Sequence, residues 1–262
     1  MARALLIDLD GVIYQNNRLI DGTIETLAWI REQHIPYLFV TNTTSRSRAT
    51  LLERFAGFGF EVEIDELMTP IVAAREYMAG HAMQRAVAFV SDDAAQDFAD
   101  VELFPWTTSE SVDAVLLGDL GRAWDYARLN AAFQLLMQSP PPTLIALGMT
   151  RYWLGPDGLQ LDVAPFVRAL ECAVDGEAVV VGKPAAAFFD AALARLRCEA
   201  GQVCMIGDDI RSDVGAAQAC GIHGIQVRTG KFREADLKGD VVPDAVLDSF
   251  AALPDWWQSR EC

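Results

Sequence analysis

Short apolar runs alternate along the chain with stretches whose apolar residues recur at helical spacing. Near the N-terminus, "ALLIDL" (4–9) and "PYLFVT" (36–41) are predicted strands, and each precedes a stretch with helical spacing. The alternation returns near the C-terminus with the runs "EAVVVG" (177–182) and "VCMIG" (203–207). Because strands that alternate with helices form parallel sheets, this pattern predicts an α/β fold in which the two ends of the chain share one domain.

Local signals predict where the helices between these strands begin and end. The helix after the second strand is expected to be capped by Ser45 or Ser47 and to end near Gly57. A later helix is predicted to begin at Pro184, because proline is favoured at the first helical position. The helix after the 203–207 strand is expected to end near Gly221.

The middle of the chain carries its own set of elements. The runs "AVAFV" (86–90), "DAVLLG" (113–118) and "TLIALG" (143–148) are predicted strands, and "YARLNAAFQLLMQ" (126–138) is a predicted helix that the following prolines terminate. We therefore expect an inserted domain. Its predicted limits are 78–178, and the predicted core domain comprises 1–77 and 179–262.

Polar groups follow four of the predicted strands at the point where each strand ends. Because the carboxyl ends of parallel strands meet at one edge of a sheet, these groups are expected to converge. Carboxylates, a lysine, hydroxyls and amides are the groups that a phosphoryl group on Mg²⁺ requires. The four sets are Asp8 and Asp10; Thr41, Asn42 and Thr43; Lys183; and Asp208, Asp209 and Asp213.

These residue types suggest a mechanism. Asp8 could attack phosphorus once Mg²⁺ and Lys183 offset its negative charge, and this step would leave an aspartyl-phosphate. Asp10, two residues on, could protonate the leaving oxygen and later activate water, which makes it a candidate general acid and base. Thr41, Asn42 and Thr43 could donate hydrogen bonds to phosphoryl oxygens.

Each segment taken singly also has an ordinary structural interpretation. An acid pair after a strand is often a turn or a helix cap, "GKP" is a common helix entry, and acids in a first helical turn favour the helix dipole. The combination of all four favours catalysis. In the segment "GMTRYWLGPDGL", Arg151, Tyr152 and Trp153 either contact a substrate or form an ordinary hairpin.

Composition narrows the classes of partner. The chain has 21 Lys and Arg residues against 37 Asp and Glu residues, and the net charge of −16 opposes binding to nucleic acid and to anionic membranes. A small phosphorylated metabolite is the expected partner. The five cysteines are odd in number and form no C-x-x-C pair, so we expect reduced thiols and a cytoplasmic location.

Four motifs resemble the signature motifs of the haloacid dehalogenase-like hydrolase superfamily: "DLDGV", "VTNTTSR", "VGKP" and "MIGDDIRSDVGAAQACG". The insert between the second and third motifs resembles the α/β cap of the class II members. Longer segments, such as "GIQVRTGKFREAD", resemble the phospholysine phosphohistidine inorganic pyrophosphate phosphatase subfamily and its hydrolase-domain-containing relatives. The resemblance implies a Rossmann-like parallel-sheet core with an inserted α/β cap domain, and phosphatase activity.

The resemblance also implies roles for individual residues. It makes Asp8 the nucleophile and a Mg²⁺ ligand, Asp10 the acid-base residue with its backbone carbonyl on the metal, and Asp208 the other carboxylate ligand. Lys183 would hold the phosphoryl group, with the 41–43 loop as phosphate-binding residues. Asp213 and Asp209 would orient the lysine or the metal waters.

Several alternatives remain open at this point. Animal members of the closer subfamily carry serine where this chain has Asp10, so a conventional phosphomonoesterase stands beside a phosphoamidase or pyrophosphatase. A dehalogenase, a phosphomutase and a non-enzymatic phospho-acceptor regulator are weaker alternatives, because a halide needs no proton from Asp10 and receiver domains lack a large insert. Caps of this kind can pair, so a homodimer is a further possibility.

Overall fold

The computed structural model describes residues 3–15, 17–155 and 158–259, and for 153–155 it describes the backbone. The chain forms two compact units. The first comprises Met1–Thr41, Leu52–Met68 and Lys183–Cys262, and the second comprises Asn42–Leu51 and Thr69–Gly182. The limits of the second unit are not those expected for the insert, 78–178, and a cap domain with those limits stays a prediction.

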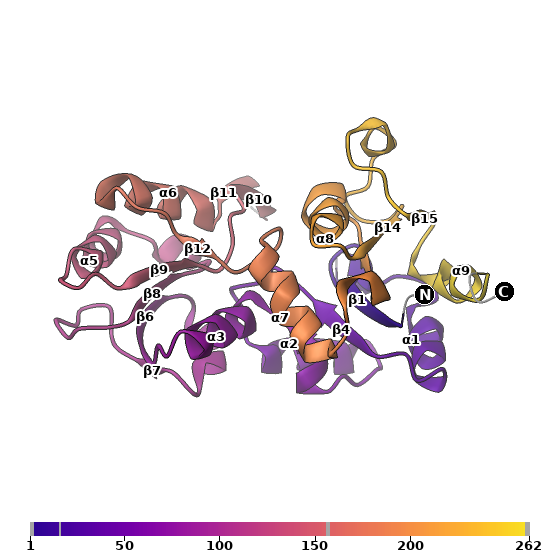
Figure 1. Ribbon diagram of the computed structural model, residues 1–262, viewed down its shortest axis with the longest axis horizontal. Coiled ribbons are helices and arrows are strands. Elements are labelled where there is room, and N and C mark those ends of the chain that lie inside the picture. The colour runs from indigo at the N-terminus through magenta and orange to yellow at the C-terminus, as the bar shows by residue number, and fades with distance from the viewer. Residues whose placement is uncertain (1–2, 16, 156–157, 260–262) are drawn as a thin grey trace. The chain divides into compact units, whose positions relative to one another are not determined.

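The first unit contains a six-stranded sheet in which every pair is parallel (Figure 1). The strand order is β15-β14-β13-β1-β4-β5. Strands β1 and β13 lie in the middle, and every residue of both is buried, as a strand covered on both faces requires. The six strands are β1 (Ala4–Asp8), β4 (Tyr37–Val40), β5 (Leu67–Met68), β13 (Val203–Gly207), β14 (His223–Val227) and β15 (Ala245–Leu247).

Helices of the first unit follow these strands along the chain. Helix α1 contacts α9, and α7 contacts α8 (Figure 1). A π-helical turn, Ile210–Gly215, leads into α8, and a short hairpin of β2 (Tyr14–Gln15) and β3 (Arg18–Leu19) follows β1. The helices are α1 (Thr23–Glu32), α7 (Ala186–Leu196), α8 (Ala216–Ala219) and α9 (Leu253–Gln258). Helix α2 (Arg48–Gly57) is divided between the units, because its first residues belong to the second.

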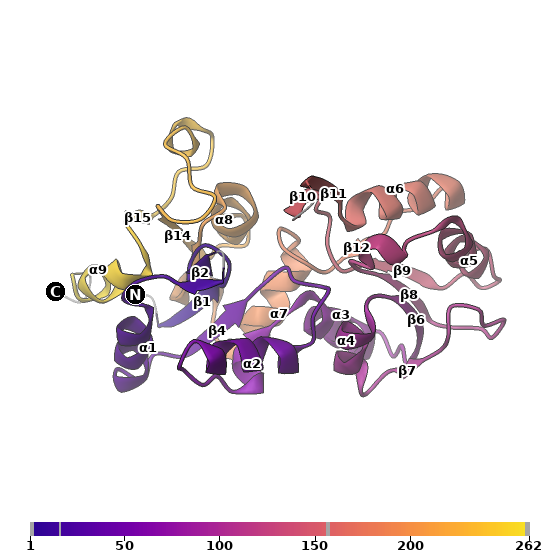
Figure 2. The ribbon, with the colours of Figure 1, turned by 180° about the vertical axis from the view of Figure 1, so that it is seen from behind.

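The second unit contains a five-stranded parallel sheet of order β12-β9-β8-β6-β7. Helices α5 and α6 cover one face and α3 lies on the other (Figures 1 and 2). The strands are β6 (Arg85–Phe89), β7 (Glu102–Leu103), β8 (Ala114–Leu117), β9 (Thr143–Ala146) and β12 (Val179–Val180). The helices are α3 (Pro70–Gly80), α4 (Asp92–Ala95), α5 (Tyr126–Leu136) and α6 (Val163–Val174), and a hairpin pairs β10 (Tyr152–Gly155) with β11 (Gly158–Leu161).

The predicted α/β class is therefore confirmed, but two local expectations are wrong. Helix α7 begins at Ala186 rather than at Pro184, because Ala185 keeps an extended backbone with φ −66° and ψ 139°. The strand within 177–182 was expected to belong to the sheet shared by the chain ends. Instead β12 pairs with β9 of the second sheet. An apolar run shows that a strand forms and does not say which sheet it joins.

The segment 42–51 is attached to the second unit by carboxylates of that unit. Asp93 accepts hydrogen bonds from the Ser47 backbone N (3.0 Å), from Ser47 Oγ (2.8 Å) and from Thr50 Oγ1 (2.9 Å). Asp97 accepts from the Arg48 backbone N at 2.8 Å. Ser47 Oγ in turn accepts from the Thr50 backbone N, which confirms Ser47 as the cap of α2. The segment that follows β4 is thus tied to residues far along the chain.

Replacing Asp93 by alanine is expected to lower the free energy of unfolding by about 1–2 kcal/mol, because the hydrogen bonds that hold Ser47 and Thr50 are lost. Urea denaturation followed by circular dichroism measures this loss. Asp92→Ala is the matched control, because Asp92 is the exposed neighbouring acid and its removal is expected to cost less than about 0.5 kcal/mol. Equal losses in the two variants would contradict the role assigned to Asp93.

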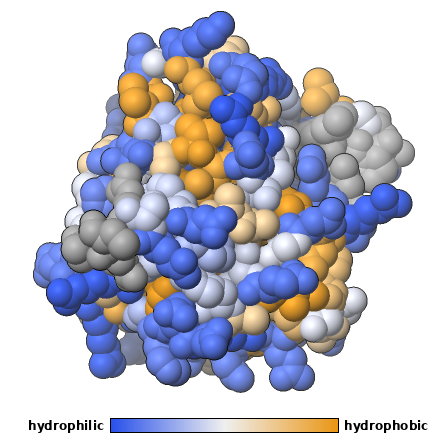
Figure 3. Space-filling view, turned by 90° about the vertical axis from the view of Figure 1, so that its right-hand side faces the viewer, coloured by the Kyte–Doolittle hydropathy of each residue, from blue (hydrophilic) through white to orange (hydrophobic). Residues whose placement is uncertain are grey.

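The surface of the first unit combines charged and apolar residues. Figure 3 shows one face on which hydrophilic residues predominate and hydrophobic residues appear between them. Within the described residues, no helix combines the length and the apolar character needed to cross a bilayer.

Candidate active site

The order of strands in the first sheet creates a topological switch point between β1 and β13, and we refer to the carboxyl edge at this point as the crevice. From β1 the chain goes to β4 on one side, and from β13 it goes to β14 on the other. Loops that leave two adjacent strands in opposite directions open the space where ligands of α/β sheets bind. Asp8 is the last residue of β1, and Asp208 directly follows β13. The two acids therefore lie at the switch point of the sheet.

Lys183 lies between two of the predicted acids. Its Nζ is 2.7 Å from Asp8 Oδ1 and 2.7 Å from Asp213 Oδ1. The side chains of Lys183 and Asp213 are each 2% exposed, and that of Asp8 is 10% exposed. A buried ammonium between two carboxylates is compensated only while both partners stay in place.

Lys183 does not come from a strand of the same sheet, as the sequence pattern suggested. It directly follows Gly182, at the point where the chain passes from the second unit to the first. A Cβ at Gly182 would overlap the Leu147 carbonyl oxygen, so the backbone just before the lysine needs glycine. The convergence of Lys183 with Asp8 is observed, but its physical cause is the chain crossing.

Burial and neighbouring charges shift the ionisation of this cluster. Desolvation raises the pKa of Asp8 well above its usual value, although Lys183 opposes the shift. Desolvation also raises the pKa of Asp208 to about 6. Burial alone would lower the pKa of Lys183, but the Asp213 and Asp8 carboxylates outweigh it and raise that pKa. The lysine therefore stays charged. Its single positive charge does not balance the negative charges of the neighbouring carboxylates.

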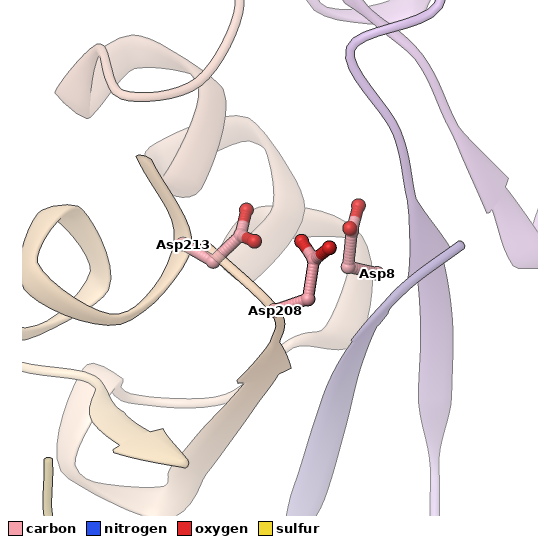
Figure 4. A group of neighbouring side chains, drawn as sticks. All are labelled: Asp8, Asp208 and Asp213. Carbon is pink, nitrogen blue, oxygen red and sulfur yellow. The ribbon is translucent and has the colours of Figure 1, made fainter. Parts of the chain in front are cut away.

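The acid cluster has the chemistry of a divalent cation site. Asp8, Asp208 and Asp213 each offer a carboxylate oxygen within 4.8 Å of the others (Figure 4). Both oxygens of Asp213 accept hydrogen bonds, from Lys183 Nζ and from the Asp209 backbone N at 3.1 Å. Asp208 Oδ1 is buried and has no hydrogen-bond partner among the described residues. A buried carboxylate oxygen without a donor is costly, and a hard cation such as Mg²⁺ would satisfy it.

Asp10 lies just beyond β1, in a turn closed by the hydrogen bond from the Gly11 backbone N to the Tyr14 carbonyl (2.8 Å). The residue remains accessible to solvent. Partial desolvation raises the pKa of its carboxyl, and the positive charges of Arg54 and Lys231 oppose that shift. A carboxyl that is accessible and holds its proton more tightly than usual suits general acid-base chemistry.

The phosphate-loop residues follow β4, the neighbour of β1. Thr41 is buried, and its backbone N donates to the Met68 carbonyl at 3.2 Å. Asn42 and Thr43 continue into the 42–51 segment of the second unit. Their assignment as phosphate-binding residues stays a prediction.

The remaining candidates occupy other positions. Asp209 caps the π-helical turn, because its Oδ1 accepts from the backbone N of Arg211 and of Ser212, each at 3.0 Å. Arg151 and Tyr152 are exposed at the hairpin of the second unit, with the guanidinium carbon 5.6 Å from the tyrosine ring centroid. Trp153 lies in β10, and its side chain is outside the described part of the chain. A substrate role for these hairpin residues stays a prediction.

Three residues that sequence reasoning did not assign also reach the site. Thr229, Gly230 and Lys231 follow β14, the strand next to β13, and contact the Asp208 carboxylate and the turn after Asp10. The sequence offers one signal for them, because the polar segment "RTGK" directly follows the apolar run "GIQV". The pairing of β14 with β13 then places this segment beside Asp208.

Known proteins resemble this chain over nearly all of its length. A sequence model described as haloacid dehalogenase-like hydrolase matches residues 5–103, and a second one, described as HAD-hydrolase-like, matches 180–253. The human phospholysine phosphohistidine inorganic pyrophosphate phosphatase is 36% identical over 97% of this chain and 93% of its own length. The bovine haloacid dehalogenase-like hydrolase domain-containing protein 2 is 41% identical over 97% and 95%.

Solved structures of phosphatases share the fold of this chain. The p-nitrophenyl phosphatase from Archaeoglobus fulgidus has a TM-score of 0.88 at 26% identity, covering 97% of this chain and 99% of that one. The glycerol phosphate phosphatase from Mycobacterium tuberculosis, solved with magnesium, has a TM-score of 0.83 at 26% identity, covering 96% and 76%. The chain belongs to the haloacid dehalogenase-like hydrolases and groups within them with the phosphatases.

Proposed function

We propose that this hydrolase is a Mg²⁺-dependent phosphatase that cleaves a small phosphorylated metabolite through an aspartyl-phosphate on Asp8. The observation that carries the proposal is the buried contact of Lys183 with Asp8 and Asp213. Beside it lies Asp208 Oδ1, which finds no hydrogen-bond partner in the part of the chain that the structure describes. Asp8, Lys183 and Asp208 lie close enough together to serve as nucleophile, phosphoryl-binding cation and metal ligand of one site.

Asp8 and Asp10 divide the chemistry between them. An Asp8 carboxylate oxygen forms a bond to phosphorus while the bond to the leaving oxygen breaks, and the Asp10 carboxyl gives its proton to that oxygen. A water then attacks the phosphorus, its proton passes to the Asp10 carboxylate, and the bond to Asp8 breaks. Asp10 ends each cycle protonated, as it began. Lys183 holds the phosphoryl oxygens, and Asp213 orients the lysine.

Asp8, the backbone carbonyl of Asp10, and Asp208 would hold the cation. When bound, Mg²⁺ supplies positive charge that lowers repulsion between the carboxylate and the phosphoryl group. Asp208 Oδ1, which has no hydrogen-bond partner within the described ranges, supports this assignment, as does the mycobacterial phosphatase solved with magnesium. Asp209 caps the turn that carries Asp213 and thereby helps to fix the position of Asp213.

A phosphoamidase or pyrophosphatase is the second candidate. The human relative at 36% identity, named for phospholysine, phosphohistidine and inorganic pyrophosphate, favours it. A panel of phosphomonoesters, inorganic pyrophosphate and phosphohistidine, each with and without Mg²⁺, separates the candidates. The best kcat/KM identifies the substrate class.

The variant Asp10→Asn tests the acid-base role. It is expected to slow hydrolysis of an alkyl phosphate by about 10²–10⁴-fold, because an amide cannot transfer the proton. With p-nitrophenyl phosphate, whose leaving group needs no proton, phosphoryl transfer to Asp8 should persist and its hydrolysis should slow. A covalent phosphoryl group is therefore expected to accumulate, and intact-protein mass spectrometry after acid quench detects it.

The comparison of the two substrates supplies the control within one variant. Equal loss on both substrates, with no covalent phosphate on the protein, would exclude Asp10 as the acid-base residue. Phosphate trapped on a residue other than Asp8 would exclude the proposed nucleophile.

A further inference from the structure

The segment Thr229–Lys231 lies against the predicted metal ligand from the neighbouring strand end. Strand β14 pairs with β13, which places the residues after Val227 beside Asp208. The Lys231 backbone N donates to Asp208 Oδ2 at 2.8 Å. The Thr229 hydroxyl donates to the Gly11 carbonyl oxygen. The segment thus joins the Asp208 carboxylate to the turn that carries Asp10.

The Asp208 carboxylate occupies space that exists because two neighbouring residues are glycines. Gly11 has φ +80° and Gly230 has φ +65°, a backbone region that other residues adopt at a cost. A Cβ at either glycine would overlap Asp208 Oδ2. A Cβ at Gly230 would also lie 2.7 Å from the Gly11 Cα. The close approach of the two backbones therefore depends on the absence of side chains.

The two oxygens of Asp208 have different surroundings. Oδ2 is held by the Lys231 backbone N and lies between the two glycines. Oδ1 is buried without a hydrogen-bond partner among the described residues. A carboxylate fixed in this way presents one chosen oxygen to a ligand, and Mg²⁺ takes single oxygens in a strict geometry.

We propose that Thr229–Lys231 is a positioning segment that fixes Asp208 so that one oxygen, Oδ1, is available to the divalent cation. The inference rests on the proposed function and adds residues to which that function gives no role. The segment acts through its backbone, through the Thr229 hydroxyl and through the lack of a side chain at Gly230. The Lys231 side chain is 68% exposed, and its Nζ is 3.5 Å from Asp209 rather than on Asp208.

Titration of Mg²⁺ into the metal-free, full-length protein by calorimetry tests the inference. Gly230→Ala is expected to weaken Mg²⁺ binding by roughly 10–100-fold, the usual effect of disturbing a group that orients a metal ligand. Gly59→Ala is the matched control. Gly59 has φ +91°, and no atom of the described residues lies within 4 Å of an added Cβ, so an alanine there introduces the same kind of backbone strain away from the site.

Further variants separate the backbone from the side chain. Lys231→Gln keeps the backbone N and is expected to bind Mg²⁺ within about threefold of the wild type, since the exposed ammonium exerts only a screened, long-range repulsion on the cation. If Gly230→Ala does not fold, Thr229→Val decides, because loss of one hydrogen bond is expected to weaken Mg²⁺ binding about two- to tenfold.

The outcomes separate the two proposals. Wild-type affinity in a folded Gly230→Ala protein, or in Thr229→Val, overturns the positioning role and leaves the phosphatase proposal standing. Equal weakening in Gly59→Ala overturns it as well, since the effect would then be general strain. If the wild-type protein itself binds no Mg²⁺, the metal assignment of the proposed function fails.

Discussion

Asp8→Asn is expected to reduce turnover of p-nitrophenyl phosphate by about 10⁴-fold or more. Without the nucleophile, the other catalytic residues have no covalent step to assist. Asparagine has nearly the same shape, but its neutral amide neither attacks phosphorus nor adds charge to a metal site. The fold is expected to persist. Desolvation raises the pKa of Asp8, and repulsion by Asp213 and Asp208 adds to the shift, so a neutral side chain is tolerated at this buried position.

Steady-state kinetics with saturating Mg²⁺ measures the loss, and circular dichroism checks the fold. Asp65→Asn is the matched control, because its side chain is 88% exposed and pairs with Arg195 away from the crevice. That variant is expected to keep wild-type turnover. Undiminished activity in Asp8→Asn would refute the assignment of the nucleophile.

Lys183→Met is expected to abolish activity and to lower the free energy of unfolding by about 3–5 kcal/mol at neutral pH, the usual cost of removing one partner from a buried ion cluster. The change leaves Asp8 and Asp213 buried without their shared cation. Chemical denaturation in metal-free buffer measures the loss. Lys238→Met, at an exposed lysine, is the control and is expected to change stability by less than about 0.5 kcal/mol.

The pH dependence of this loss has a definite sign. In the folded protein, desolvation raises the pKa of Asp208 to about 6 and raises the pKa of Asp8 well above its usual value, so both carboxyls bind protons more readily folded than unfolded. Such groups penalise the fold at high pH, and the penalty fades as pH falls through the folded pKa. Loss of Lys183 removes the ammonium that lowers the pKa of Asp8, so this penalty is larger in Lys183→Met than in the wild type. The deficit of the variant should therefore shrink between pH 7.5 and pH 5. A deficit that stays constant or grows would contradict the uncompensated carboxylates.

The segment 42–51 shows why a motif can be recognised while its attachment cannot. Polar residues after β4 predict a loop and a helix cap, and Ser47 does cap α2. The carboxylates that hold this cap belong to Asp93 and Asp97. They lie 46 and 49 residues along the chain from the groups they bind. No local pattern encodes such a partner, because the contact exists only once the second unit has folded.

The sequence by itself determined the α/β class, most of the strands, and the acids and lysine of the crevice. It could do so because apolar periodicity and strand-end polarity are local properties of the chain. Only the tertiary structure decided that β12 joins the second sheet, that Lys183 reaches Asp8 where the chain passes between units, and that Gly230 leaves room for Asp208. Those three facts depend on which backbones come close in space, and the order of residues along one strand carries no record of its neighbours.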